Sequence, residues 1–137
     1  MNNFVWPVRI YYEDTDAGGV VFHANYLKFF ERARTEMLRA MGYEQDALAA
    51  SEGIIFAVRS AQIDYLSPAR FNELLQVTTK VSLAKKVSFT FEQTITRGDV
   101  VLCQGNIRIA CLDVQNMRPK AIPEILLRAL EHSINEY

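Results

Sequence analysis

The chain has 137 residues, of which 50% are hydrophobic, and its formal net charge at pH 7 is −1. A chain of this length can bury one substantial core but not two, so we expect residues 1–137 to form a single domain. Because the charge is nearly balanced and the basic residues are scattered, the sequence indicates no basic patch that would bind nucleic acid nonspecifically. Nucleic acid is therefore not an expected partner.

The N-terminal segment predicts one strand and no targeting signal. Residues 5–13 are rich in Val, Ile and Tyr and alternate well enough for a strand, with Pro7 marking its start or an edge position. No long apolar run follows a basic region, as it would in a signal peptide, and no segment is long and apolar enough to span a bilayer. We therefore expect a cytoplasmic protein.

The next predicted element is a helix enclosed on most of its sides. Apolar residues recur at helical spacing between residues 25 and 41, and others widen the same face: Tyr26, Leu27, Phe29, Phe30, Ala33, Met37, Leu38 and Met41. Asn25 is the expected N-cap, and Gly42 supplies the left-handed residue that commonly ends a helix. Residues 14–23 then form the loop at the helix N-terminus, where backbone N–H groups and the helix dipole stabilise negative charge.

The rest of the chain predicts an antiparallel meander. A short helical segment is expected at residues 44–51. Four strands and a closing helix are expected at residues 54–65, 73–83, 87–97, 100–112 and 125–134. The strand at 54–65 should be half-buried because its second half alternates. One strand, a buried helix and four strands predict an α+β domain whose sheet curls around its most apolar helix.

The motif before and within the helix resembles a known family. The run Y-x-D-T-D-x-x-G-V-V-x-H-x-x-Y-L-x-x-x-E-x-A-R-T-E extends from Tyr12 to Glu36, and residues 58–70 continue the likeness with Y-L-S-P-A-R. Both closely resemble the 4-hydroxybenzoyl-CoA thioesterase group of hotdog-fold acyl-CoA thioesterases, and most of all its YbgC-type branch, which is associated with the bacterial Tol–Pal system. The resemblance implies a hotdog fold, hydrolysis of acyl-CoA, and a homodimer or homotetramer.

Asp16 is the main catalytic candidate. Its position matches the catalytic aspartate of the family that the motif resembles, and its loop precedes a helix N-terminus. The structural alternative is an Asx-turn or a cap, which Asp residues in such loops often form. As a catalytic group it could attack the thioester carbonyl and form an anhydride, or it could activate a water molecule. The sequence leaves this choice open.

The neighbours of Asp16 have different expected roles. Asp14 is expected to hold the turn through backbone hydrogen bonds. His23 is the second catalytic candidate, because its backbone N–H or its imidazole could polarise the carbonyl, although it could also simply hydrogen-bond the turn. Gly19, Val20 and Tyr26 of the motif are expected to contact the substrate, since glycine permits a close approach of a ligand to the backbone.

Coenzyme A is expected as part of the substrate, and its phosphates need cations. Arg59, Arg70, Lys85 and Lys86 lie at predicted strand ends or connections, although each alone could be an ordinary solvated charge. The two lysines, followed by Ser88, are the best candidates because a hairpin tip presents them together. No other cofactor is expected.

The sequence does not predict a metal site. The spacing of acidic residues and glycines from Asp14 onward resembles a calcium loop, but Phe22 and Asn25 occupy the ninth and twelfth positions, where Asn25 replaces a bidentate Glu. Cys103 and Cys111 lack the nearby His or Cys partners of a zinc site. They are expected to be buried free thiols.

Taken together, these features predict an acyl-CoA thioesterase with a composite site. A second chain should face Asp16, near residues 64–70, because one curled sheet leaves open edges and a shallow cleft. Two alternatives stay open: a hotdog hydratase or dehydratase that acts on acyl thioesters with His23 as base, and a non-catalytic interaction module for acyl carrier protein or the cell envelope. Acyl carrier protein is also a possible partner of the enzyme.

Overall fold

The structure is a computed structural model that describes residues 4–135, and the single-domain prediction for residues 1–137 therefore includes a few terminal residues outside that range. Its elements in chain order are β1 (Phe4–Arg9), a 3-10 turn (Tyr12–Asp14), α1 (Asn25–Ala40), α2 (Gln45–Glu52), β2 (Ile54–Tyr65), β3 (Leu74–Ala84), β4 (Ser88–Arg97), β5 (Val100–Asp113) and α3 (Glu124–Asn135).

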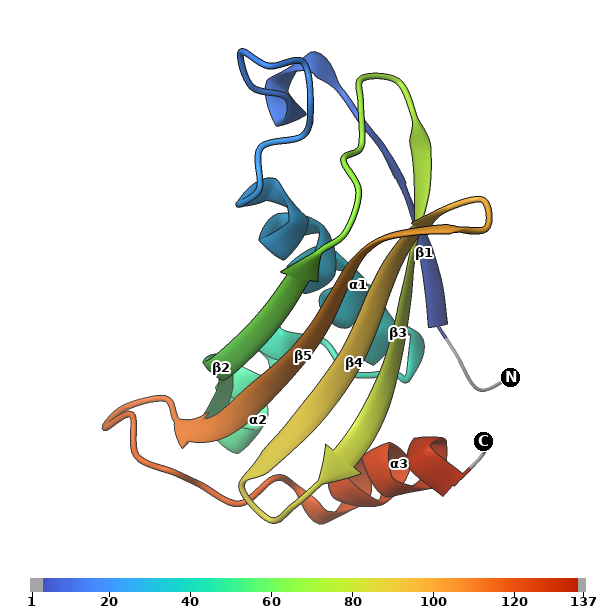
Figure 1. The fold of residues 1–137 in the computed structure, drawn as a ribbon. Helices are drawn as coiled ribbons and strands as arrows, with labels where there is room; N and C mark the ends of the chain where they lie inside the picture. The colour runs from blue at the N-terminus through green and yellow to red at the C-terminus, as the bar shows by residue number, and fades with distance from the viewer. Residues whose placement is uncertain (1–3, 136–137) are drawn as a thin grey trace.

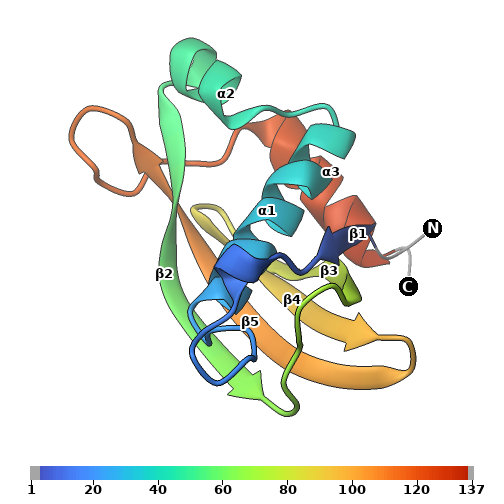
Figure 2. The same ribbon diagram turned by 90° about the horizontal axis from the view of Figure 1, so that it is seen from above.

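One five-stranded sheet organises the chain. Its strand order is β1-β3-β4-β5-β2, and every neighbouring pair is antiparallel. The sheet curves around α1, while α3 lies across the sheet near β3 (Figure 1). Figure 2 shows the same arrangement from above, with α1 in the hollow of the sheet. The predicted α+β class, with a curved antiparallel sheet around a central helix, is confirmed.

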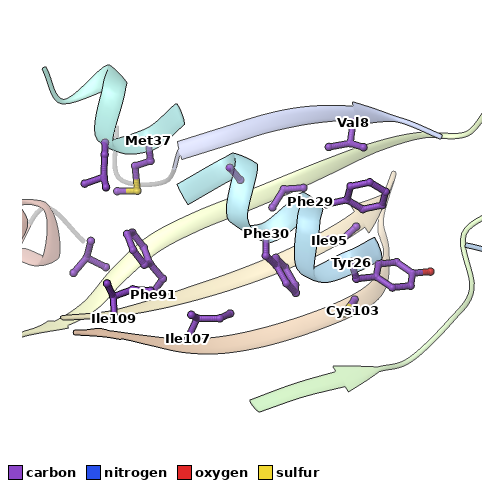
Figure 3. Packing of buried hydrophobic residues seen from close by; sticks show 14 of the residues in the cluster. Val8, Tyr26, Phe29, Phe30, Met37, Phe91, Ile95, Cys103, Ile107 and Ile109 are labelled. Carbon is purple, nitrogen blue, oxygen red and sulfur yellow. The ribbon is translucent and has the colours of Figure 1, made fainter. Parts of the chain in front are cut away.

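The core lies between α1 and the concave face of the sheet. Phe29, Phe30 and Ala33 of α1 are at most 1% exposed. The rings of Phe29 and Phe30 lie among side chains of the sheet (Figure 3). Gly105 of β5 makes this close approach possible, because a Cβ atom there would lie 3.1 Å from the ring of Phe30 and 2.9 Å from Ile107. A larger residue at this position would overpack the core.

Two sequence predictions at the N-terminal end are wrong. The strand predicted for residues 5–13 ends at Arg9, because the chain turns where the Asp14 carboxylate accepts a hydrogen bond from the Tyr11 N–H at 2.9 Å. Asn25 is not an N-cap but lies inside α1, and its side-chain amide donates instead to the Asp14 carbonyl at 2.8 Å. The predicted helix end is confirmed, since Gly42 has φ +97°.

β2 is an edge strand, and most of it from Val58 onward is open to solvent in the single chain. The predicted half-burial fails there, because no element among residues 4–135 covers this part: Val58 is 54% exposed and Tyr65 47%. Within the described residues, no helix is long and apolar enough to cross a membrane.

Candidate active site

The loop that carries Asp16 is closed by its own hydrogen bonds. The Asp16 backbone N–H donates to the Val20 carbonyl at 2.9 Å, and the Gly19 N–H donates to the Asp16 carbonyl at 3.0 Å. The Asp16 carboxylate accepts from the Gly18 N–H through Oδ1 at 2.8 Å, as in an Asx-turn. Because Oδ2 accepts no hydrogen bond from the described part of the chain and the side chain is exposed, the carboxylate has an oxygen left for chemistry.

The start of α1 offers backbone donors beside this loop. The N–H groups of Asn25, Tyr26 and Leu27 donate to carbonyls three residues earlier. The N–H groups of His23 and Ala24 donate to no group among the described residues. Free N–H groups at the positive end of a 16-residue helix are suited to binding an anion or a developing oxyanion.

The imidazole of His23 is exposed and belongs to an aromatic cluster. Its ring centroid lies 4.5 Å from that of Phe22 and 6.1 Å from that of Tyr65, at the end of β2. Tyr65 also contacts Tyr26, with ring centroids 5.7 Å apart. Burial raises the pKa of Tyr65, so this phenol stays protonated at neutral pH.

The structure also shows the surroundings of three further residues of the motif. Gly19 has φ +79°, and nothing lies within 4 Å of the position of a Cβ atom, so the backbone there is open to a ligand. Val20 forms an isolated antiparallel bridge with Arg70. Tyr26 is only 3% exposed, and its hydroxyl accepts a hydrogen bond from the Ala69 N–H at 3.1 Å. Burial, partly offset by this bond, raises its pKa.

Asp14 has the structural role that the sequence predicts. Its carboxylate accepts from the Tyr11 N–H, and its carbonyl accepts from the Phe22 N–H at 3.0 Å and from the Asn25 amide. Asp14 therefore fixes the entry to α1, whereas the contacts of Asp16 lie within its own loop.

The predicted phosphate-binding cations do not gather around Asp16 in one chain. Arg70 lies beside the loop through its bridge with Val20. Lys85 and Lys86 lie in the β3–β4 connection, at the end of the sheet opposite the Asp16 loop (Figure 1). The 10 residues of β4 separate the two ends of the sheet by about 30 Å. Ser88 is 5% exposed, in β4 rather than at the hairpin tip.

Arg59 has a different place from the other cations. It lies at an irregularity in the pairing of β2 with β5, where the register shifts between Val58 and Ser60. Its side chain is exposed on the edge strand. Any group that Arg59 binds would therefore lie along the open edge of the sheet.

Arg34 is a buried charged residue to which sequence reasoning gave no role. It is 9% exposed, and its Nη1 donates to Gln93 Oε1 at 3.0 Å. The Gln93 amide in turn donates to the Phe30 carbonyl and to Thr79 Oγ1, both at 2.9 Å. Burial lowers the pKa of Arg34, while Glu31 opposes that shift. Arg34 lies four residues after Phe30, a spacing that places both residues on the same buried face of the helix.

A small cavity adjoins Arg34. Its volume is about 110 Å³, and it is lined by α1, α2 and three strands: Glu31, Arg34, Thr35, Leu38, Gln45, Phe56, Val58, Phe89, Phe91 and Ile109. The cavity is therefore lined by both aromatic rings and a guanidinium group.

Cys103 and Cys111 are buried free thiols, as predicted. Burial raises the pKa of Cys103 to about 12 and that of Cys111 to about 11. Among the described residues, no group of three or more His, Cys, Asp or Glu side chains could hold a metal ion. The expected independence from metals stays a prediction.

Comparison with known proteins identifies the family. The model of the thioesterase-like superfamily matches residues 10–130. The chain is 45% identical over 131 residues to an acyl-CoA thioesterase YbgC from Haemophilus influenzae, an alignment that covers 96% of each chain. It is 43% identical over 125 residues to an acyl-CoA thioester hydrolase YbgC from Escherichia coli O6:H1, covering 90% of this chain and 92% of that relative.

Solved structures agree with these relatives. The crystal structure of a probable thioesterase from Bartonella henselae superposes with a TM-score of 0.85 and 36% identity, covering 88% of this chain and 99% of that one. The resemblance seen in the motif is thereby confirmed. The chain belongs to the thioesterase-like superfamily and is a hotdog-fold thioester hydrolase of the YbgC type.

Proposed function

We propose that the protein hydrolyses acyl-CoA to a free acid and coenzyme A, with the Asp16 carboxylate as the reacting group of the enzyme. The observation that carries this proposal is the position of the exposed Asp16 carboxylate on the loop before α1, where the His23 and Ala24 N–H groups have no acceptor among the described residues. The relatives named as acyl-CoA thioesterases support the substrate class.

In the proposed reaction, these N–H groups bind the thioester oxygen as it becomes negative. In one route, Asp16 takes a proton from water, the resulting hydroxide adds to the carbonyl carbon, and the C–S bond breaks as sulfur receives that proton. In the other, Asp16 adds to the carbon, the thiolate leaves, and water then hydrolyses the anhydride. A single turnover in ¹⁸O-water separates the routes, because only hydrolysis of the anhydride can place ¹⁸O in the Asp16 carboxylate.

The role of His23 in this proposal rests on its backbone. Its N–H lies at the helix N-terminus without an acceptor in the described part of the chain, whereas its imidazole packs against Phe22 and Tyr65. His23→Ala should therefore keep most of the activity. A loss as large as that of Asp16→Asn would assign the chemistry to the imidazole instead.

The proposed enzyme works as a pair of chains. Within one chain, Lys85 and Lys86 are too far from Asp16 to bind the same coenzyme A directly, and the open β2 edge exposes Val58 and Tyr65. A second copy that pairs its β2 antiparallel to this edge would bring the opposite end of its own sheet towards Asp16. Gly19 and Val20 would then contact the substrate from one chain, and the lysines and Arg59 from the other.

The cavity beside Arg34 is the proposed place for the end of the acyl group. Phe56 and Val58 of β2 line it, so it adjoins the edge at which the two chains would pair. Because this cavity has a volume of only about 110 Å³, the substrates tested should include acyl groups of different length.

The decisive experiment is thiol release from a panel of acyl-CoA and acyl-carrier-protein substrates, measured beside sedimentation of the same samples. The thioesterase proposal predicts stoichiometric release of free thiol and acid, unchanged by EDTA. A hydratase or dehydratase would change the acyl chain without releasing thiol, and an interaction module would do neither. A fully active monomer would contradict the proposed pair.

A further inference from the structure

We propose that the ion pair between Glu73 and Arg97 positions Asp16 from a distance, by holding the segment 69–73 against both ends of the Asp16 loop. The inference rests on the proposed role of Asp16 and adds two positioning residues that do not touch the substrate. Figures 1 and 2 both show the segment that joins β2 to β3 beside the loop that precedes α1.

The segment first holds the chain that enters the loop. The Ile10 N–H donates to the Glu73 carbonyl at 2.9 Å, and the Asn72 N–H donates back to the Ile10 carbonyl at 2.8 Å. Beyond this pair, the rings of Tyr12 and Phe71 stack at a centroid distance of 3.8 Å and an interplanar angle of 4°. These contacts fix residues 10–12, up to the first residue of the 3-10 turn that leads to Asp16.

The segment also holds the chain that leaves the loop. The Val21 N–H donates to the Ala69 carbonyl at 2.9 Å, and Val20 and Arg70 form an antiparallel bridge. The Ala69 N–H donates to the Tyr26 hydroxyl in the first turn of α1. Residues 69–73 therefore contact the loop on both sides and the helix that follows it.

Asp16 depends on these two ends because its own hydrogen bonds lie within the loop. Among the described residues, the carboxylate and backbone of Asp16 bond to Gly18, Gly19 and Val20. The Asp14 carbonyl ties one side of the loop to Phe22 and Asn25, and residues 69–73 hold the chain on either side of it. A shift of residues 69–73 would thus tilt the loop about the Asp14 contacts and move the carboxylate relative to the N–H groups of His23 and Ala24. A misplacement of about 1 Å by a distant change can lower a rate roughly a hundredfold.

The segment in turn is held by one carboxylate and one guanidinium. Glu73 Oε1 accepts from the Arg70 N–H at 2.8 Å and from Arg97 Nη1 at 3.1 Å, and Arg97 Nη1 also reaches the Pro68 carbonyl at 3.3 Å. The two side chains are 27% and 34% exposed, so solvent screens the pair less than it screens a fully exposed pair. Arg97 is the last residue of β4 and thus anchors the segment to the sheet.

The segment contains one residue with a left-handed backbone. Asn72 has φ +70°, a conformation that Asn tolerates better than most residues other than glycine. The turn at Asn72 is thus compatible with the sequence, but its position depends on the bonds that hold the segment. Without the bonds from Arg97, the segment would be free to relax, and the loop ends would move with it.

The test compares variants of Arg97 with a matched control. Arg97→Met removes the ion pair. Arg97→Lys keeps the charge but moves the donor nitrogen from the position of Nη1, which reaches both Glu73 and Pro68. Glu73→Gln keeps an acceptor without the charge. The control is Arg128→Met, which removes the exposed pair with Glu124 on α3. Turnover is measured at a temperature where circular dichroism shows every variant to be fully folded.

The proposal predicts that Arg97→Met lowers kcat roughly tenfold with little change in KM, and that Arg97→Lys lies between it and the wild type. The Arg97→Met/Glu73→Gln double variant should be no worse than Arg97→Met, because both changes break one unit. Arg128→Met should match the wild type. Hydrogen exchange should become faster at the Gly18, Gly19 and Val21 amides only in the Arg97 and Glu73 variants.

Two outcomes would overturn the proposal. One is a folded Arg97→Met variant with wild-type kcat and unchanged exchange in residues 16–21. The other is exchange in Arg97→Met that becomes faster by the same factor throughout the sheet as in residues 16–21, which would indicate a general loss of stability without a specific effect on the loop. If the wild type released no thiol, the proposed function would fail, while the exchange measurement would still decide whether the ion pair holds the loop.

Discussion

The hydroxyl of Tyr26 accepts a hydrogen bond from the backbone N–H of Ala69 at 3.1 Å, which joins the first turn of α1 to the segment after β2. Ala69 is 0% exposed and Tyr26 is 3% exposed, so no water can replace this bond without rearrangement. The bond therefore contributes both to stability and to the placement of the start of the helix.

Tyr26→Phe tests that bond directly. The change keeps the ring but leaves the buried Ala69 N–H without an acceptor, which should lower the free energy of unfolding by about 1 to 3 kcal/mol. Chemical denaturation gives this value. Tyr12→Phe is the matched control, because Tyr12 is 75% exposed and keeps its stacking on Phe71 as Phe. Equal stability of wild type and Tyr26→Phe would show that the bond contributes nothing.

The buried network of Arg34 predicts a compensating pair of variants. Gln93→Leu leaves the Arg34 guanidinium buried without its hydrogen-bond acceptor and should destabilise the protein by about 3 kcal/mol. The Arg34→Met/Gln93→Leu double variant should be more stable than Gln93→Leu, because no unpaired charge is left beside the cavity. If the double variant were the less stable of the two in thermal unfolding, Arg34 would stabilise the fold independently of Gln93.

The pKa shifts of the buried thiols predict how stability depends on alkaline pH. Burial raises the pKa of Cys103 to about 12 and that of Cys111 to about 11, so between about pH 9 and these values the folded state binds more protons than the unfolded state. Their contribution is complete below pH 9 and is lost as pH rises through the folded pKa values.

The corresponding measurement is the melting temperature between pH 7 and pH 11 for the wild type and for Cys103→Ala. The melting temperature of the wild type should fall more steeply above pH 9 than that of the variant. Parallel curves would show that the thiol of Cys103 does not titrate differently in the two states.

The sequence was informative where local pattern decides structure. The periodicity around Phe30 gives α1, the alternation of residues gives the strands, and Gly42 marks the helix end, because each depends on neighbours in the chain. The motif likewise placed Asp16 on a loop before a helix N-terminus. These features need no knowledge of distant residues.

Apart from the strand that ends at Arg9, where a local bond between Tyr11 and Asp14 turns the chain, the misses involve partners that are distant in sequence or absent from the single chain. Tyr26 and Ala69 are 43 residues apart, and Arg97 and Glu73 are 24 apart, so no local pattern predicts their bonds. Asn25 lies inside the helix because the Asp14 carbonyl takes its amide. Most of β2 from Val58 onward is exposed where alternation predicted half-burial, since a strand pattern does not reveal whether another element covers it.

The central claim is that the carboxylate of Asp16 carries out thioester cleavage, and the most direct measurement is the kcat of Asp16→Asn beside that of Asp14→Asn. The amide oxygen of the substituted side chain can still accept from the Gly18 N–H, so the loop should keep its shape while the negative charge is lost. Turnover by Asp16→Asn should fall by about a hundredfold or more, with Asp14→Asn near the wild type. Wild-type turnover by a folded Asp16→Asn variant would contradict the account.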